Sequence, residues 1–197
     1  AYNYDVRAFL KKWLIDLRND QSESGEIPFV APDCIFEKHT DAMWCDAITM
    51  VPWTLYEMYG DEDFLKDNFE AMKKFVSARE RTMQNGLIVR GHEFGDWLAL
   101  DRDPFTKDEL TGRTDVYFLT NVFHVHSLKI VRDTAKRLGD TEAEGIYNEK
   151  YQTQLRRVRK EYFTATGRLV YDTVTAQTVA LHFGIVPQEF RPSLAQA

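Results

Sequence analysis

The residues of this 197-residue chain best suited to chemistry are two tryptophans that lie beside acidic side chains. Trp44 stands two residues before Asp46 in the stretch DAMWCDA, and Trp97 follows Glu93 and Asp96 in the stretch HEFGDWLAL. Flat aromatic rings stack on the C–H face of a sugar, and carboxylates accept hydrogen bonds from its hydroxyls or act as acid and base. Together with the extended, proline-bearing stretch SGEIPFVAPD, these residues predict a carbohydrate site.

Each of these residues also has a purely structural interpretation. Position alone makes Trp44 a core residue more often than a ligand platform. Asp46 would be explained equally well by burial with hydrogen-bond partners, or by a place near a helix N-terminus. Trp97 lies on an expected loop, where binding and packing are about equally balanced. Trp13 and Trp53 have the spacing of packing residues.

Periodic apolar residues predict an all-α chain. The stretches 4–19, 62–82 and 141–162 each carry one apolar face, which is typical of helices with one side in solvent. The stretches 41–59 and 114–138 are apolar nearly all round, and another buried helix is expected from 175 to 184. Outer and inner helices therefore alternate along the chain.

The expected connections alternate as well. Short Gly60-Asp61 and Gly139-Asp140 turns follow inner helices, and they mark a weak internal repeat. The long connections 20–40, 83–113 and 163–173 precede inner helices, and loops of that length are usually functional. This pattern predicts about half of a six-hairpin barrel, a partial (α/α)6 toroid with its long loops on one rim. A helical-repeat solenoid is the alternative, but its loops would be shorter and more regular.

Composition narrows the function classes. A net charge of −6 and a pI near 5.4 argue against nucleic acid as a partner, because phosphate binding needs a concentrated basic patch. The basic run at 156–160 is expected on a solvated helix face. No apolar run of about 18 residues predicts a membrane span. Cys34 and Cys45 lack metal-ligand spacing, and two buried thiols are favoured over a disulfide.

Other motifs give little reason to expect a metal or a cofactor. His124 and His126 are two residues apart, so on a helix they point to different faces and do not chelate one metal. The stretch DRDPFTKDEL resembles a calcium loop superficially, but it lacks the glycine and the terminal glutamate at the required offsets. The sequence also lacks a serine nucleophile elbow, a P-loop and zinc-ligand spacing.

Four ordered motifs carry a family resemblance. YNYDVRAFLKKWLIDLRNDQSESGEIPFVAPD, DAMWCDAITMVPWTLYEMYGDEDFL, FGDWLAL and TAQTVALHFGIVP resemble, in this order, glycoside hydrolase family 78, the α-L-rhamnosidases. The resemblance implies an (α/α)6 catalytic barrel and inverting hydrolysis of terminal α-L-rhamnosides. Trp44 and Trp97 match tryptophans that line the rhamnose pocket, and Asp46 and Asp96 match the acids beside them. These four are the expected substrate-binding residues. Cys45 stands where the family usually has glycine.

The resemblance also implies that the catalytic pair lies elsewhere. The general acid of the family belongs to an E-R-x-G-W-T-G-D type of motif before the stretch YNYD, and the general base belongs to a later segment. We therefore expect residues 1–197 to be a single fragment of the catalytic domain, with no catalytic carboxylate and no activity alone. Its open barrel edges are candidate surfaces for self-association, and a soluble place in the bacterial cytoplasm or periplasm is expected.

Three other kinds of enzyme and one binding module compete with this interpretation. A polysaccharide lyase, an N-acylsugar epimerase and an unsaturated glucuronyl hydrolase share the barrel architecture. A lyase would need a Tyr/His pair and clustered basic residues, whereas Arg90, Arg102 and Arg113 are scattered. A non-catalytic helical-repeat binding domain would present an extended groove in place of a pocket.

Overall fold

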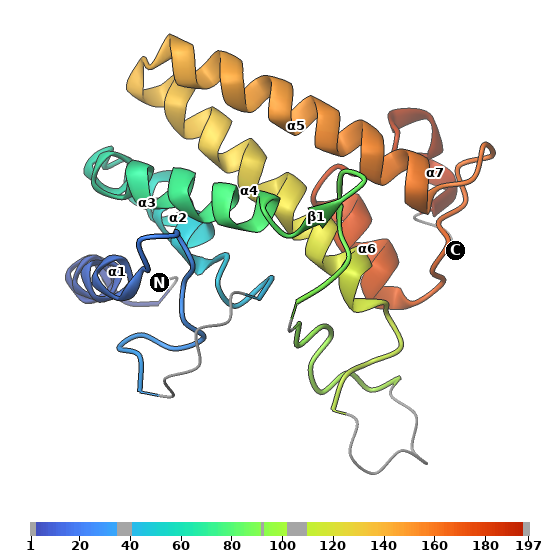
Figure 1. Cartoon of the computed structure of the whole chain (residues 1–197), viewed down its shortest axis with the longest axis horizontal. Coiled ribbons are helices and arrows are strands. Elements are labelled where there is room, and N and C mark those ends of the chain that lie inside the picture. Colours follow the sequence, from blue (N-terminus) through green and yellow to red (C-terminus); the bar gives the residue numbers. More distant parts are fainter. Residues whose placement is uncertain (1–2, 35–40, 92, 102–109, 195–197) are drawn as a thin grey trace.

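The computed structural model describes residues 3–34, 41–91, 93–101 and 110–194, and helices dominate it (Figure 1). Its elements are, in chain order, α1 (Arg7–Asp20), α2 (Ala47–Tyr59), α3 (Asp63–Glu80), β1 (Met83–Gln84), β2 (Leu87–Ile88), α4 (Val116–Leu138), α5 (Thr141–Tyr162), α6 (Val174–His182), the 3-10 turn η1 (Gln188–Phe190) and α7 (Arg191–Leu194). The predicted all-α class is confirmed.

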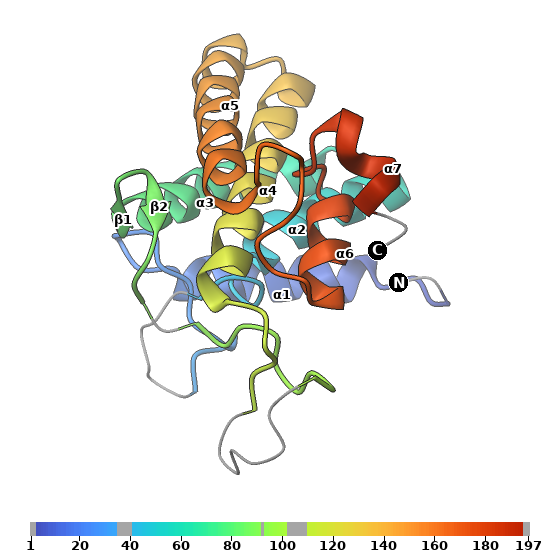
Figure 2. The same ribbon diagram turned by 90° about the vertical axis from the view of Figure 1, so that its right-hand side faces the viewer.

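The helices alternate between an inner and an outer position. Inner helix α2 packs against α1, α3 and α4, and inner helix α4 packs against α3, α5 and α6. Figures 1 and 2 show α4 crossing the middle of the molecule with α5 antiparallel beside it. Buried side chains surround α4, among them Phe118, Leu119, Val122 and Val125. The predicted half of a six-hairpin toroid is confirmed, with α2 and α4 inside and α1, α3 and α5 outside. The expected burial of α6 is wrong for these residues, because only Ala176 and Ala180 of this helix are buried and Val174 is exposed.

The apolar core has two parts that meet on α4. One part joins α1, α2 and α3 to the C-terminal half of α4 through residues such as Leu14, Met72 and Leu128. The other joins the N-terminal half of α4 to α5 and α6 through residues such as Val158 and Ala180. Since α4 belongs to both, it fixes the two helical hairpins relative to each other.

The short turns behave as their glycines predict. Gly60 and Gly139 end α2 and α4 in the left-handed region, at φ of 69° and 74°. Asp140 then caps α5 by accepting a hydrogen bond from the Ala143 backbone N at 2.9 Å. In the other turn Asp61 accepts from the Asp63 backbone N instead, one residue before the cap position of α3.

The start of α2 differs from the prediction. The helix begins at Ala47 and not at Asp41, because residues 42–46 form turns. Met43 has a left-handed φ of 71°, which no helix interior accommodates. Its backbone N donates to the Asp46 carboxylate at 2.8 Å, and this bond holds the turn closed. Trp44 therefore lies on a turn before the helix, not in its first turn.

The sequence interpretation also missed short elements. The stretch 83–88 is a β-hairpin, in which Met83 pairs with Ile88 around an Asn85-Gly86 turn. Both turn residues have positive φ, and an Asn-Gly pair between two short apolar stretches is the usual signal for such a hairpin. The 3-10 turn η1 and the short helix α7 were not predicted either.

The cysteines do not both occupy the core. Cys45 is buried, as predicted, but Cys34 is exposed, and both thiols are free. The Cys45 Sγ donates to the Ile27 backbone O at 3.2 Å and so joins the turn before α2 to the segment before it. Among the described helices, none is both long and apolar enough to cross a membrane.

Candidate functional site

Four aromatic side chains from three segments form one cluster. The Phe94 ring lies at the centre, with ring centroids 4.8 Å from Trp44, 5.4 Å from Trp97 and 4.9 Å from Phe29. Phe29 comes from the loop after α1, Trp44 from the turn before α2, and the other two from the long connection before α4. The predicted convergence of these three segments is confirmed.

Both tryptophans of this cluster face solvent in part. Trp44 is 43% exposed and Trp97 is 40% exposed, although each ring packs against Phe94. A large aromatic side chain that packs against a neighbouring ring and is partly open to solvent can stack on a ligand without rearrangement. The two indoles therefore form a ready aromatic platform.

Asp46 is buried and is not part of this exposed platform. Its side chain is 2% exposed, and its two carboxylate oxygens accept hydrogen bonds from the Ser127 hydroxyl and the Met43 backbone N. Burial raises the pKa of this carboxyl above its ordinary value, and the hydrogen bond from Ser127 opposes that shift. The carboxylate ties the turn that carries Trp44 to α4.

Asp96 holds the loop that carries Trp97. Its Oδ2 accepts a hydrogen bond from the Thr175 hydroxyl in the first turn of α6, at 2.5 Å. Its backbone O accepts from the Gly112 N at 2.8 Å, where a Cβ on residue 112 would lie 2.5 Å from the Ala99 Cβ. The side chain is partly exposed, so Asp96 reaches both α6 and the solvent on this rim.

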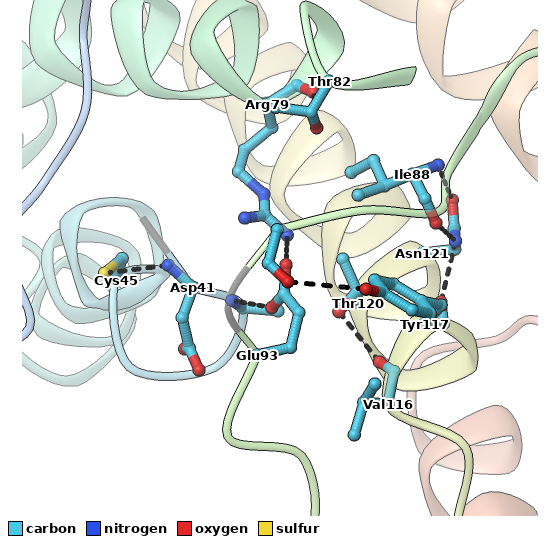
Figure 3. A network of polar contacts seen from close by, with 12 residues as sticks. Asp41, Cys45, Arg79, Thr82, Ile88, Glu93, Val116, Tyr117, Thr120 and Asn121 are labelled. Atoms are coloured by element: carbon cyan, nitrogen blue, oxygen red, sulfur yellow. Dashed lines mark hydrogen bonds and ion pairs between the residues drawn. The ribbon is translucent and has the colours of Figure 1, made fainter. Parts of the chain in front are cut away.

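Three charged residues form a buried network between the two tryptophan segments (Figure 3). Arg79 Nη2 reaches from α3 to Glu93 Oε1 at 2.7 Å, and the two side chains are 5% and 2% exposed. Glu93 Oε2 accepts from the Ala42 backbone N at 2.7 Å, and Asp41 Oδ2 accepts from the Phe94 backbone N at 2.7 Å. Asp41 is fully buried, and its Oδ1 has no partner among the described residues.

Glu93 is predicted from the sequence as a potential site acid, whereas the sequence pattern indicates no role for Asp41 or Arg79. The sequence does indicate that Arg79 is buried, because this residue continues the apolar stripe of Met72, Phe75 and Val76 on the buried face of α3. An arginine on an apolar stripe is rarely buried unless it is paired, and it therefore indicates an acidic partner nearby. The sequence does not reveal which acid that is.

Burial, together with the neighbouring charge of Glu93, raises the pKa of Asp41 to about 7, while the hydrogen bond from the Phe94 N acts in the opposite direction. An Asp41→Asn variant should therefore show a distinct pH dependence. A carboxyl with a raised folded-state pKa stabilises the fold fully below its unfolded pKa, and this contribution is lost as the pH rises through the folded pKa. Relative to the variant, the natural protein should lose stability between pH 4 and pH 7, by at most about 4 kcal/mol at about 1.4 kcal/mol per pKa unit. Urea unfolding of both proteins across this range measures the difference.

The comparison with the variant is needed because buried histidines act in the opposite direction. Burial lowers the pKa of His124 to about 3 and that of His126 to about 4, so both favour the folded state more as the pH rises. They are present in both proteins, so their contribution cancels in the difference. A difference that stays constant from pH 4 to pH 7 would contradict the raised pKa of Asp41.

The structure gives the two histidines packing positions. Both His124 nitrogens are buried and lack a hydrogen-bond partner among the described residues, while His126 stacks on Phe183 at 4.1 Å. In the described part of the chain, no group of three or more His, Cys, Asp or Glu side chains is arranged to hold a metal ion. Most of the calcium-like stretch, residues 102–109, lies outside the described residues.

Known proteins resemble this chain over nearly its whole length. A 32% identical α-L-rhamnosidase of Alteromonas sp. (strain LOR) matches over 95% of this chain and 20% of its own length. The crystal structure of an Aspergillus terreus α-L-rhamnosidase superposes with a TM-score of 0.90 at 28% identity, over 98% of this chain and 23% of that one. A Streptomyces avermitilis α-L-rhamnosidase in complex with L-rhamnose gives 0.86 at 27% identity, over 98% of this chain and 17% of that one.

The chain thus spans about a fifth of the length of the relatives that it matches. A family model described as the bacterial α-L-rhamnosidase six-hairpin glycosidase domain matches all of it, residues 1–197. The match, the alternating helices and the superpositions agree with one another. The chain belongs to the six-hairpin glycosidase domain family of the bacterial α-L-rhamnosidases.

Proposed function

We propose that these residues are part of the catalytic domain of an inverting α-L-rhamnosidase and supply one wall of its sugar pocket. The observation that carries the proposal is the pair of half-exposed indoles of Trp44 and Trp97, both of which pack against the ring of Phe94. Rhamnose has a methyl group and C–H faces that suit aromatic stacking. The complex of the Streptomyces avermitilis relative with L-rhamnose supports this choice of sugar.

The four predicted substrate-binding residues receive different parts in this proposal. Trp44 and Trp97 stack on the sugar, and Asp96 lies at the rim, where it can accept a hydrogen bond from a hydroxyl. The assignment of Asp46 to substrate binding stays a prediction. Its side chain is buried, and both carboxylate oxygens accept hydrogen bonds within the protein. We therefore propose that Asp46 affects sugar binding indirectly, by fixing the turn that carries Trp44.

The acid and base that cleave the glycosidic bond are proposed to lie outside residues 1–197. In support, the carboxylates of Asp41, Asp46 and Glu93 are buried and accept hydrogen bonds from backbone amides. Inverting hydrolysis needs an acid facing the leaving oxygen and a base facing a water molecule on the opposite side of the sugar, about 6.5–9.5 Å apart. We propose that residues 1–197 alone are inactive, and self-association through the open barrel edges stays a prediction.

Hydrolysis of an aryl α-L-rhamnoside by the full-length natural protein tests the proposed reaction. Proton NMR of the first turnovers should show β-L-rhamnose before mutarotation, because a single displacement inverts the anomeric carbon. An aryl β-D-glucoside serves as the control substrate and should be left intact. Release of the α anomer first, or no cleavage of the rhamnoside, would rule out the inverting rhamnosidase.

A further inference from the structure

The two segments that carry the tryptophans are joined by two hydrogen bonds of opposite direction. Asp41, from the segment of Trp44, accepts from the Phe94 backbone N in the segment of Trp97 at 2.7 Å. Glu93, from the segment of Trp97, accepts from the Ala42 backbone N in the segment of Trp44, also at 2.7 Å. Each segment therefore receives a carboxylate from the other, and neither can slide without breaking both bonds.

This reciprocal pair is fixed to the helical frame. The second oxygen of Glu93 binds Arg79 on α3, in an ion pair that is almost fully buried. The Asp41 backbone N donates to the Cys45 Sγ at 3.4 Å, and Cys45 in turn bonds the Ile27 backbone O. Figure 3 shows Asp41 and Glu93 side by side, with Arg79 descending onto Glu93 from α3. The junction thus connects both tryptophan segments to α3.

The two hydrogen bonds of this pair hold the backbone amides of residues that set the positions of the indoles. The amide that Asp41 holds belongs to Phe94, whose ring contacts both Trp44 and Trp97. The amide that Glu93 holds belongs to Ala42, next to the left-handed Met43 that directs the chain toward Trp44. A shift of either amide would therefore change the separation and the tilt of the two rings.

We propose that Asp41 and Glu93 form a carboxylate latch, and that they are positioning residues that set the spacing of the Trp44 and Trp97 rings for the sugar. The identity of that sugar rests on the proposed function, whereas the latch itself rests on the contacts alone. Neither carboxylate touches the sugar, and each acts through the backbone of the neighbouring segment.

The latch lowers the stability of the fold, and this cost indicates that it does more than fill space in the core. Two carboxylates and one arginine are buried together, and Asp41 Oδ1 has no partner within the described residues. Such an arrangement is unfavourable for stability alone, because apolar side chains would fill the same space without loss of solvation. Local arrangements that cost stability are expected where function requires a fixed geometry.

Asp41→Ala and Asp41→Asn in the full-length protein test the latch. Alanine removes the acceptor for the Phe94 amide, so that amide should exchange its hydrogen at least about tenfold faster, and the dissociation constant for L-rhamnose should rise about tenfold. Asparagine keeps an oxygen acceptor at the same place and should recover most of both losses. If the alanine variant does not fold, Asp41→Glu replaces it, because the longer side chain keeps the acid but displaces the amide.

Asn121→Ala is the matched control. Asn121 on α4 likewise holds a neighbouring backbone, by accepting from the Ile88 N at 3.0 Å and donating to the Ile88 O at 2.8 Å. These bonds join α4 to β2 and involve no residue of the aromatic cluster, so its loss should lower the unfolding temperature but leave the L-rhamnose affinity within about twofold. An equal loss of affinity in the control would show that general destabilisation, not the latch, weakens binding, and would overturn the proposal.

Trp97→Ala separates failure of the latch from failure of the proposed function. If Trp97→Ala weakens L-rhamnose binding but Asp41→Ala does not, the latch is overturned while the sugar site stands. If Trp97→Ala binds L-rhamnose like the natural protein, the proposed sugar site is wrong. In that case the exchange rate of the Phe94 amide alone decides whether Asp41 holds the two segments together, and an unchanged rate would overturn the latch.

Discussion

Replacing Arg79 by methionine should lower the free energy of unfolding by about 3–5 kcal/mol, the usual cost of removing one partner from a buried ion pair. Methionine occupies a similar volume, so the loss comes from the charge and not from a cavity. The Glu93 carboxylate, which is 2% exposed, would stay buried without its cationic partner, while its hydrogen bond from the Ala42 amide remains. Urea unfolding followed by circular dichroism measures the effect.

Arg156→Met is the control for this prediction. Arg156 is exposed on α5 and donates to the Thr153 hydroxyl, so its replacement should change the free energy of unfolding by less than about 0.5 kcal/mol. Adding Glu93→Gln to Arg79→Met should restore part of the loss, because it removes the unpaired charge. A loss of less than about 1 kcal/mol for Arg79→Met would show that the ion pair does not hold the two segments.

Replacing Trp97 by alanine should weaken the binding of a terminal α-L-rhamnoside about 30-fold, which corresponds to about 2 kcal/mol. The loss has two sources: the indole no longer covers the C–H face of the sugar, and Phe94 loses the edge contact that supports it. The stability of the fold should change little by comparison, since 40% of Trp97 already faces solvent. Calorimetric titration with L-rhamnose measures the affinity, and thermal unfolding measures the stability.

Leu100→Ala tests whether removing any apolar side chain from this loop weakens the binding of L-rhamnose. Leu100 lies three residues from Trp97 and its side chain is fully exposed, without a place in the aromatic cluster. Its replacement should leave the affinity for L-rhamnose within about twofold. Equal losses for the two variants would argue against stacking on Trp97.

The sequence predicts more of the fold than of the candidate site. Apolar periodicity separates one-faced from all-round helices, and long loops before each inner helix indicate a toroid, because both features depend on local sequence. The start of α2 could not be placed in the same way. Residues 41–46 have a helical composition, but the Asp46 carboxylate and the left-handed Met43 stabilise a turn there. The side chain of Asp46 competes with helical backbone hydrogen bonds, and the apolar periodicity of the sequence does not reveal this competition.

The tryptophans could be identified from sequence because their type alone suggests the chemistry. The residues that place them could not, since Arg79, Asp41 and Glu93 meet only after α3 and the two segments have packed. Their pairing depends on contacts between residues far apart in the chain. The predicted role of Asp46 illustrates the same limit, because sequence spacing puts it beside Trp44 but does not show that its side chain is buried.

A crystal structure of the full-length protein with L-rhamnose is the most direct test of the central claim. We expect the sugar between the two segments, with the indoles of Trp44 and Trp97 in van der Waals contact at about 4 Å, and the carboxylates of Asp41 and Glu93 still bound to the Phe94 and Ala42 amides. L-rhamnose bound elsewhere, with both indoles open to solvent, would contradict the assignment of these segments to the sugar pocket.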